Sequence, residues 1–560
     1  MTTIAARPQR AAPAGKPQEA LALTYHRLML VMLVFAGVTL LIVGRLGFLA
    51  LSTDRAEAAS GNPLLPPRGD IVDRNGVPLA RTIDAWSIAI HPRKLIGDPA
   101  TLAAKVAELI PGRSEAEYRR ILTSDKNFVY LQRRAVPELV SAVNALGEPA
   151  IVFDREPERL YPQTGLAAHI LGWTDFDGHG VTGMEKVLEE RLSDPALRDT
   201  PVALSIDTRV QAAMESELGA AMVKHSAEGA TGIVLDVDTG EIIALASFPT
   251  FNPNAAGDSP PDSRFNRATQ GVYELGSTFK PITVAAAMEA GVVKSMSQRY
   301  QSGAPIQIGR FRIRDDHPIP GSANIVETLV HSSNIVTAQI ADQMGAARMQ
   351  AAFRALGFHE PAHVELPKGS PLFPSDWGRA RVLTSGYGHG VAVTPLHLAS
   401  AYAALVNGGI WRPATVMKAK TPPPGRRVYS EETSFKMRQM LRMIVLEGTG
   451  RKGEAPGFRV GGKTGTAEKT SGNGYSRKVN VSTFAAAFPM DDPRYVVVAM
   501  LDAPKGTADT FGFTTAAWTA APVVSKVISR SGPLLGIIPS ETRDIDVSVP
   551  MALVGKPKEH

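Results

Sequence analysis

The chain has 560 residues and no cysteine, which excludes thiol nucleophiles, thiolate metal ligands and disulfides. Its length predicts about three or four domains, and its 44% hydrophobic and 20% charged residues are ordinary for a globular protein. The net charge of +6, from 60 basic and 54 acidic residues, argues against a dedicated nucleic-acid-binding protein, so we expect no nucleic-acid partner.

The first predicted element is a membrane-spanning helix at residues 28–51. Residues 28–44 carry no charge, Arg45 follows, and an apolar run then continues to Leu51. At a rise of about 1.5 Å per residue this stretch would cross a hydrocarbon core of about 30 Å, and Arg45 could extend to the headgroups. A signal peptide cleaved near Ala56-Glu57-Ala58 is the alternative, but the apolar run is longer than signal peptides carry.

Residues 1–27 are expected to be a cytoplasmic tail. Their first twenty or so residues are rich in Ala and Pro and look disordered. Positive charge before a membrane helix stays in the cytoplasm, so everything after residue 51 is expected outside it. Four basic residues and one acidic residue precede the apolar run: Arg7, Arg10, Lys16 and Arg27, and Glu19.

Four segments are expected after the helix: a polar, Pro-rich linker at 52–65, a mixed domain at 66–200, a larger domain at 201–540 and a C-terminal tail at 541–560.

Local patterns predict the elements of the two domains. In the mixed domain, Asp73-Arg74-Asn75-Gly76 predicts a hairpin turn between alternating apolar runs, and residues 99–110 predict an amphipathic helix. In the larger domain, strand-like segments at both ends enclose Ala-rich helices. This order predicts an α+β domain whose sheet is assembled from the two ends of the segment.

Ser277 and Lys280 form a Ser-x-x-Lys motif directly before an apolar helix. Residues three apart share a helix face, so the hydroxyl and the amine would meet at the helix N-terminus. A serine nucleophile needs an adjacent base, and a lysine can serve when burial or a nearby cation lowers its pKa. The helix N-terminus also offers N–H groups to a developing oxyanion. Alone the motif is weak, since about one chance match is expected in such a chain.

Two further motifs follow in order. Ser332-Ser333-Asn334 opens a helix, where serine and asparagine could be ordinary N-caps, or a hydroxyl could relay a proton while an amide orients the substrate. Lys463-Thr464-Gly465-Thr466 lies in a strand-like segment. Gly465 would allow another backbone to approach this strand closely. The lysine and the two threonine hydroxyls would face an anionic group of the substrate.

Four other motif matches are interpreted as accidental. The G-x-x-x-x-G-K-T at 457–464 and the G-x-G-x-x-G at 448–453 are not followed by a helix pattern, which phosphate binding requires. Pro361 interrupts the H-E-x-x-H at 359–363, which zinc binding needs on one continuous helix face. A second Ser-x-Asn, at 471–473, lies after the Lys-Thr-Gly in a flexible loop pattern.

Ser-x-x-Lys, Ser-x-Asn and Lys-Thr-Gly together are the signature of penicillin-binding proteins and serine β-lactamases. The chain resembles class B penicillin-binding proteins, and among them the division-specific peptidoglycan D,D-transpeptidases. One departure is Leu275, where the family usually has proline. Beyond the three motifs, the resemblance rests on segments similar to the family's pedestal domain, 68–76, 159–162 and 180–185, and on segments similar to its transpeptidase domain, 249–254 and 386–395.

The resemblance implies an α+β fold: a penicillin-binding/serine β-lactamase-like transpeptidase domain, an N-terminal mixed pedestal domain and one transmembrane helix. Ser277 would attack the penultimate D-Ala carbonyl of a stem pentapeptide ending in D-Ala-D-Ala. Lys280 would take its proton, and Ser332 would relay a proton to the departing D-Ala. β-Lactams would acylate the same serine, and no metal or cofactor is implied.

The other site residues would bind the substrate. By the same resemblance, Asn334 would bind the stem-peptide amide. Lys463, Thr464 and Thr466, with Gly465 between the threonines, would hold the terminal carboxylate. The N–H groups of Ser277 and Thr466 would form the oxyanion hole.

The resemblance also implies a single-pass protein of the bacterial inner membrane, with a periplasmic catalytic domain at the division septum. Its helix would pair with a membrane glycan polymerase of the SEDS type, and its pedestal would contact other division proteins. An elongation-type transpeptidase stays open, although such paralogues tend to be longer and to carry Asp where Asn334 stands. An anchored β-lactamase or β-lactam sensor would not need the pedestal, and an inactive scaffold would not need Ser277 and both lysines.

Overall fold

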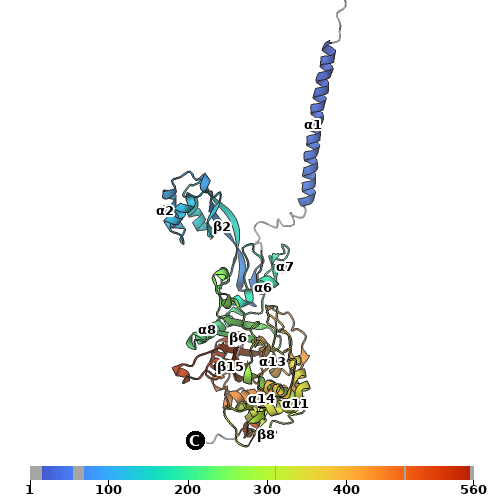
Figure 1. Cartoon of the computed structure of the whole chain (residues 1–560), viewed down its shortest axis with the longest axis vertical. Helices are drawn as coiled ribbons and strands as arrows, with labels where there is room; N and C mark the ends of the chain where they lie inside the picture. The colour runs from blue at the N-terminus through green and yellow to red at the C-terminus, as the bar shows by residue number, and fades with distance from the viewer. Residues whose placement is uncertain (1–15, 54–67, 310, 472–473, 555–560) are drawn as a thin grey trace, which may run out of the picture. The chain divides into compact units, whose positions relative to one another are not determined.

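The computed structural model describes residues 16–53, 68–309, 311–471 and 474–554, and the chain forms two compact units, Met1–Leu65 and Pro66–His560. In the first unit, α1 (Lys16–Thr53) is drawn in blue in Figure 1. Its segment Arg27–Arg45 is long and apolar enough, by length and composition, to cross a membrane.

The helix α1 begins earlier than the sequence predicted. It starts at Lys16, inside the region expected to be disordered, because Gln, Glu, Ala and Leu at 18–23 favour a helix. The rest of the predicted tail, residues 1–15, and residues 54–65 of the predicted linker lie outside the described residues.

The N-terminal domain of the second unit is built on one long strand, β2. Residues 81–90 of β2 pair with β4, its C-terminal half pairs with β3 and its start pairs with β1, all antiparallel. The predicted hairpin turn joins β1 to β2: Gly76 has a φ of +86°, and the Asp73 carboxylate accepts the N–H groups of Asn75 and Val77 at 2.8 and 2.9 Å. The strands are β1 (Ile71–Val72), β2 (Pro78–Ile90), β3 (Val129–Ala135), β4 (Ile151–Leu160) and β5 (Val202–Ala203), which lies parallel to β1.

Three helices cover the end of this sheet that carries β3. The predicted helix at 99–110 is α2 (Pro99–Leu109), which begins where the Asp98 carboxylate accepts the Thr101 N–H at 2.8 Å. With α3 (Glu115–Leu122) and α4 (Pro137–Asn144) it encloses a separate hydrophobic core around Ile88, Val106 and Tyr118.

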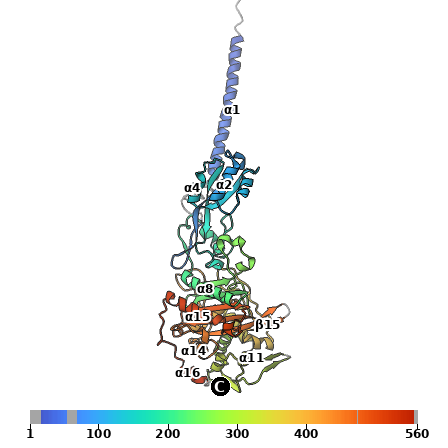
Figure 2. The ribbon, with the colours of Figure 1, turned by 90° about the vertical axis from the view of Figure 1, so that its left-hand side faces the viewer.

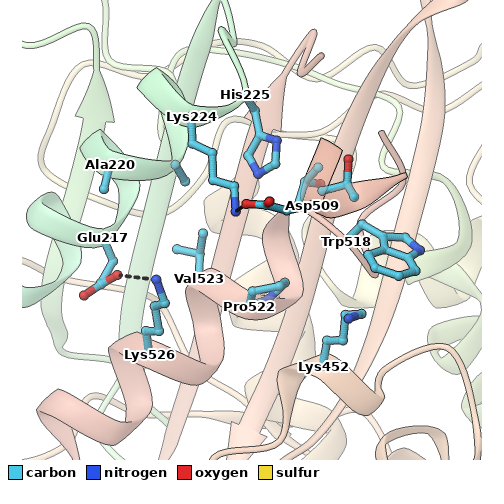
Figure 3. Close-up of a pocket in the computed structure, with 13 residues that line it drawn as sticks. Glu217, Ala220, Lys224, His225, Lys452, Asp509, Trp518, Pro522, Val523 and Lys526 are labelled. Carbon is cyan, nitrogen blue, oxygen red and sulfur yellow. Dashed lines mark ion pairs between the residues drawn. The ribbon is translucent and has the colours of Figure 1, made fainter. Parts of the chain in front are cut away.

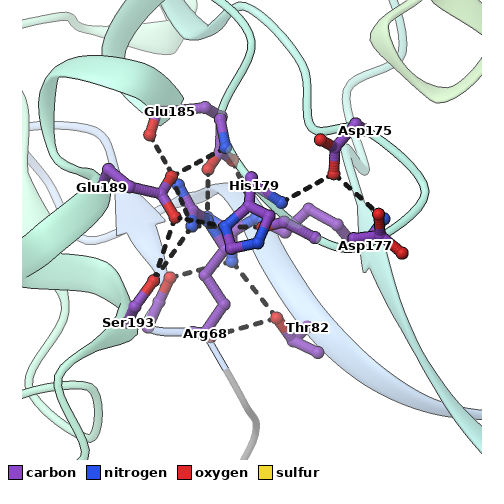
Figure 4. A network of polar contacts seen from close by, with 12 residues as sticks. Arg68, Thr82, Asp175, Asp177, His179, Glu185, Glu189 and Ser193 are labelled. Atoms are coloured by element: carbon purple, nitrogen blue, oxygen red, sulfur yellow. Dashed lines mark hydrogen bonds and ion pairs between the residues drawn. The ribbon is translucent and has the colours of Figure 1, made fainter.

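A buried ionic network fixes the point where the chain enters this domain (Figure 4). Glu185, in α6 (Gly183–Val187), has no exposed surface and accepts hydrogen bonds from Arg68 Nε and Arg159 Nε, each at 2.7 Å. Arg68 also pairs with Glu189 at 3.0 Å. Each oxygen of the Glu185 carboxylate therefore holds one arginine, and the two arginines come from segments 91 residues apart.

Hydrogen bonds join this domain to the larger domain that follows it. Asp73 Oδ2 accepts the N–H and the hydroxyl of Thr208, the first residue of α8 (Thr208–Lys224), at 3.1 and 2.9 Å. The Asn254 side chain exchanges two hydrogen bonds with the Tyr161 backbone, at 2.9 and 3.0 Å. Segments similar to family motifs therefore meet at this junction.

The larger domain contains an antiparallel five-stranded sheet in the order β14-β15-β16-β6-β7. As predicted, its strands come from the two ends of the segment, and the first end meets the second where β6 pairs with β16. The strands are β6 (Gly229–Asp236), β7 (Ile242–Phe248), β14 (Gly461–Ser471), β15 (Gly474–Phe488) and β16 (Tyr495–Asp502).

Helices cover both faces of the sheet (Figure 2). Alternate residues of a strand point to opposite faces: Val234 of β6 packs with the cluster of α8 and α15, and Ile233 with the cluster that contains α13. The longer helices are α9 (Lys280–Glu289), α11 (Asn334–Ala355), α13 (Pro395–Val406), α14 (Glu431–Glu447) and α15 (Ala520–Ser531). Shorter elements are α5 (Ala168–Leu171), α7 (Glu189–Ser193), β8 (Arg299–Gln301), β9 (Ile306–Ile308), β10 (Phe311–Ile313), β11 (Ser322–Asn324), α10 (Ile325–Val330), α12 (Arg379–Ser385), β12 (Ile410–Trp411), β13 (Arg426–Arg427) and α16 (Ser548–Leu553).

Residues 541–554, part of the predicted C-terminal tail, pack against the larger domain. The side chain of Arg442 in α14 is 2% exposed, and its guanidinium pairs with Asp544 at 2.8 Å. Gln439 Nε2 donates to Asp546 O at 2.6 Å, and Asn324 Nδ2 donates to Leu553 O at 2.8 Å. This segment therefore adds to the packing around α10 and α14.

The buried network predicts a large effect of Glu185→Gln. The substitution leaves two buried arginines facing a neutral amide, so we expect the free energy of unfolding of the N-terminal domain to fall by about 3 kcal/mol. Urea unfolding of the full chain in detergent measures this. The control is Glu190→Gln, an exposed neighbour expected to change it by less than about 0.5 kcal/mol. Equal midpoints for the two variants would contradict the assigned role of Glu185.

Candidate active site

Ser277 and Lys280 lie where a short 3-10 turn, η5 (Gly276–Phe279), runs into α9. Side chains three residues apart nearly eclipse in a 3-10 turn, which directs Ser277 and Lys280 to the same side. Ser277 is half-buried, whereas Lys280, the first residue of α9, has no exposed surface. The predicted helix start is therefore present, with a 3-10 turn as its first part.

The Lys280 amine contacts the second predicted motif. Its Nζ donates to Ser332 Oγ at 3.0 Å and also to the Ser332 carbonyl oxygen. Ser332 has a φ of +60°, in the left-handed region that a serine rarely adopts, and this conformation turns both oxygens of the residue toward the lysine. The Ser-x-x-Lys and Ser-x-Asn motifs are thus in direct contact.

Capping of α11 leaves the Ser332 side chain available for this contact. The N-cap is Ser333, whose Oγ accepts the Val336 N–H at 3.1 Å. Asn334 is the first helical residue, and its Nδ2 donates to the Arg314 carbonyl at 2.9 Å. The capping interpretation therefore holds for Ser333, and the serine before it faces Lys280.

The Lys-Thr-Gly motif lies on β14, the edge strand next to η5. Lys463 has no exposed surface, and its Nζ donates to the Thr464 carbonyl at 3.0 Å. The Thr464 and Thr449 hydroxyls lie 2.7 Å apart, and Thr466 Oγ1 accepts the Ala516 N–H at 3.3 Å.

A close approach of two backbones joins β14 to η5. A Cβ on Gly465 would lie 2.4 Å from the Leu275 carbonyl oxygen and 2.7 Å from Thr278 Cγ2. A Cβ on Gly276 would lie 2.8 Å from the Thr466 carbonyl oxygen. The prediction that Gly465 permits a close backbone approach is therefore confirmed, and this approach brings the third motif to the first.

Burial lowers the pKa of both lysines of the site. Burial lowers the pKa of Lys280 to about 7, although the carboxylates of Asp315 and Asp316 oppose the shift. Burial also moves the pKa of Lys463 well below its ordinary value, and the positive charge of Lys280 adds to that shift. Near neutral pH a substantial fraction of Lys280 is an uncharged amine, which is the form that can accept a proton.

Asp315 is a residue near the site that the sequence did not reveal. It follows β10, and its carboxylate accepts the Asn334 N–H at 2.6 Å and the Ser333 hydroxyl at 2.6 Å. Eighteen residues separate it from Ser333, and no local pattern links the two. An acidic residue facing a helix N-terminus is a common pairing, but nothing in the sequence indicates which acid faces which helix.

The segment at 386–395 packs beside the site, as the resemblance implied. The Gly276 N–H donates to the Gly388 carbonyl oxygen at 3.3 Å, and a Cβ on Gly388 would lie 2.1 Å from the Gly276 carbonyl oxygen. This contact supports the turn that carries Ser277.

Two of the motif matches interpreted as accidental have no matching structure, and residues 472–473 of the second Ser-x-Asn lie outside the described residues. Residues 359–363 form no helix, and the G-x-x-x-x-G-K-T sequence leads into strand β14 instead of a helix. Within the described part of the chain, no three His, Asp or Glu side chains are grouped so that they could hold a metal ion.

A separate cavity of about 200 Å³ lies between α8 and α15 (Figure 3). Lys224, Lys526 and Trp518 line it, and none of the predicted site residues does. Lys224 pairs there with Asp509 at 2.9 Å. The contacts among the three motifs, and not this cavity, define the candidate active site.

Comparison with known proteins agrees with this geometry. Residues 230–525 match the penicillin-binding protein transpeptidase domain, and residues 63–194 match the penicillin-binding protein dimerisation domain. The chain belongs to the penicillin-binding protein transpeptidase family. It is therefore a transpeptidase with an α+β catalytic domain behind an N-terminal non-catalytic domain.

Similar proteins cover most of the chain. A probable peptidoglycan D,D-transpeptidase FtsI of Caulobacter vibrioides is 40% identical over 483 residues, 84% of this chain and 82% of that protein. The peptidoglycan D,D-transpeptidase FtsI of Escherichia coli K12 is 30% identical over 472 residues, 78% of this chain and 79% of that protein. Together with the apolar segment of α1, these relatives indicate a membrane-anchored protein.

A solved structure shows the same fold. Penicillin-binding protein 3 of Mycobacterium tuberculosis, in a complex with aztreonam, matches with a TM-score of 0.67 and 24% identity, covering 86% of this chain and 99% of that one.

Proposed function

We propose that the chain is a peptidoglycan D,D-transpeptidase that crosslinks the stem peptides of the septal cell wall. The observation that carries the proposal is the buried Lys280 amine, which bonds to Ser332 and lies one turn from Ser277. A base whose pKa lies near the working pH is suited to activate a serine hydroxyl. The relatives named FtsI support the peptidoglycan substrate and the septal role.

Acylation comes first in the proposed reaction. Ser277 Oγ attacks the carbonyl carbon of the penultimate D-Ala, and its proton passes to the neutral Lys280 amine. The bond to the terminal D-Ala breaks, and Ser332 relays a proton from Lys280 to the departing amine, because its hydroxyl lies 3.0 Å from Nζ. The products are an ester on Ser277 and free D-Ala.

Deacylation completes the crosslink. An amine of a second stem peptide attacks the ester carbonyl and loses a proton to Lys280. A new amide bond forms, the ester bond to Ser277 breaks, and Lys280 returns the proton to Ser277 Oγ. The chain's own serine therefore carries the peptide between the two half-reactions, and β-lactams would acylate the same serine in place of the stem peptide.

The remaining site residues would bind the substrate. Lys463, Thr464 and Thr466 would hold the terminal carboxylate along β14, with Gly465 keeping that strand close to η5. β14 is an edge strand, so some of its backbone N–H groups have no partner strand to bond to. The Thr466 N–H would be one of these, and together with the Ser277 N–H it would form an oxyanion hole. Asn334 would orient the stem-peptide amide.

The domain organisation predicted from the sequence completes the proposal. Residues 1–27 lie in the cytoplasm, and residues 28–51 cross the inner membrane. Residues 52–65 link the membrane helix to the pedestal at 66–200. The catalytic domain at 201–540 and residues 541–560 lie in the periplasm at the septum. The transmembrane helix pairs with a SEDS-type glycan polymerase, and the pedestal contacts other division proteins.

For the proposed function, the first prediction concerns the nucleophile. Ser277→Ala removes the hydroxyl that forms the ester, so we expect a fluorescent penicillin not to label this variant in membranes. The control Ser471→Ala, in the accidental Ser-x-Asn match, should be labelled like the wild type.

In cells, depletion of the protein should give filaments that Ser277→Ala does not rescue. Labelling of Ser277→Ala would refute the site, and rounded cells on depletion would indicate an elongation role instead.

The second prediction concerns pH. The pKa of Lys280, lowered by burial to about 7, means that the amine is mostly protonated below pH 7 and mostly neutral above it. Protonated lysine cannot accept the serine proton, so the rate constant of acylation by penicillin should fall about 10-fold for each pH unit below that midpoint. Stopped-flow fluorescence from pH 5 to 9 measures this, and a rate that does not change between pH 5 and 7 would contradict the role of Lys280.

The third prediction concerns topology and uses the absence of cysteine. A membrane-impermeant maleimide on spheroplasts should label Lys126→Cys, an exposed position in the pedestal, but not Thr3→Cys in the tail. Permeabilised membranes should label both variants. The reverse pattern on spheroplasts would contradict the proposed orientation.

A further inference from the structure

The segment after the β9–β10 hairpin binds the backbone of the Ser332-Ser333-Asn334 turn. Asp315 Oδ1 accepts the N–H groups of Asn334 and Ile335, at 2.6 and 2.9 Å. Asp315 Oδ2 accepts the Ser333 hydroxyl at 2.6 Å. One half-buried carboxylate therefore takes three donors at the start of α11.

These three bonds restrict the turn on one side while Lys280 restricts it on the other. Ser333 Oγ donates to Asp315 and accepts the Val336 N–H, so the N-cap has a single arrangement. Ser332, directly before it, has a φ of +60°, a strained conformation that a non-glycine residue keeps only where its surroundings enforce it. The contacts at Asp315 and Lys280 are the surroundings that enforce it here.

The neighbouring backbone contributes to the same restraint. The Arg314 carbonyl accepts the Asn334 side-chain amide at 2.9 Å, so residues 314 and 315 together hold both the main chain and the side chain of Asn334. A carboxylate at the N-terminus of a helix is also favoured by the helix dipole. The segment after β10 is therefore built to hold this turn.

We propose that Asp315 is the positioning residue of the active site: its carboxylate holds the Ser332-Ser333-Asn334 turn so that the Ser332 hydroxyl faces the Lys280 amine. The proposal rests on the function proposed above, because it concerns the same proton relay. Asp315 itself touches neither Ser277 nor the substrate in this scheme and acts through Ser332 and Asn334.

The charge of Asp315 has a second, smaller consequence. Four titratable groups surround Lys280: Asp315 and Asp316 after β10, Lys463 on β14 and His389 in the 386–395 segment. The two carboxylates favour the protonated lysine, so removing either one lowers the pKa of Lys280. Asp316 is exposed and, within the part of the chain described, makes no hydrogen bond to the turn. It is therefore the matched control for charge.

The test measures acylation of the full-length protein by a fluorescent penicillin, as a rate constant on the alkaline plateau and as the fraction of protein labelled. Asp315→Ala removes the three bonds, and we expect its plateau rate constant to fall about 10-fold or more with full labelling. Asp315→Asn keeps an acceptor for the two N–H groups and should fall less. Asp316→Ala and Asp316→Asn should leave the plateau rate constant unchanged. They should only shift the pH at which the rate constant falls to a lower value.

The outcomes separate positioning from stability. A reduced rate constant at full labelling supports the proposal, because a role in folding alone would lower the labelled fraction and leave the rate constant unchanged. The proposal would be overturned if the plateau rate constants of both Asp315→Asn and Asp315→Ala lay within twofold of those of the Asp316 variants. It would also be overturned if the Asp315 variants showed a lower labelled fraction with an unchanged rate constant. Wild-type protein that is not labelled at Ser277 would instead refute the proposed function itself.

Discussion

Lys280 places a primary amine where it has no exposed surface, and water cannot stabilise its positive charge there. The amine instead depends on the Ser332 hydroxyl and carbonyl, which reach it only because Ser332 adopts a left-handed conformation. That conformation in turn depends on the capped start of α11 and on Asp315. The chemistry of the site therefore follows from one desolvated amine and the contacts that it requires.

The same constraint explains the backbone packing around the serine. Lys463 brings a second buried amine near the first, and this amine lies on β14, which reaches η5 only because Gly465 has no side chain. Two like charges in a buried site disfavour each other, so the arrangement favours neutral amines until an anionic group enters. A substrate carboxylate would supply that group, which links substrate binding to the protonation state of the lysines.

Local features could be predicted from the sequence, and features that depend on distant contacts could not. The Asp73 turn, the start of α9 and the Lys-Thr-Gly strand are each encoded within a few residues, and the order of the three motifs indicated the family. Asp315 was missed because its partners lie 18 to 20 residues away across a hairpin. The ion pair of Asp544 with Arg442 joins residues 102 positions apart and was not predicted for the same reason.

The most direct test of this account is the pKa of Lys280 itself. The full-length protein, labelled with ¹³C at lysine Cε, can be titrated by NMR, and the Lys280→Arg variant assigns the resonance. We expect a midpoint near 7, because burial outweighs the two nearby carboxylates. A midpoint close to 10.5, the ordinary value for lysine, would show that the amine is charged at neutral pH and would contradict its role as the base.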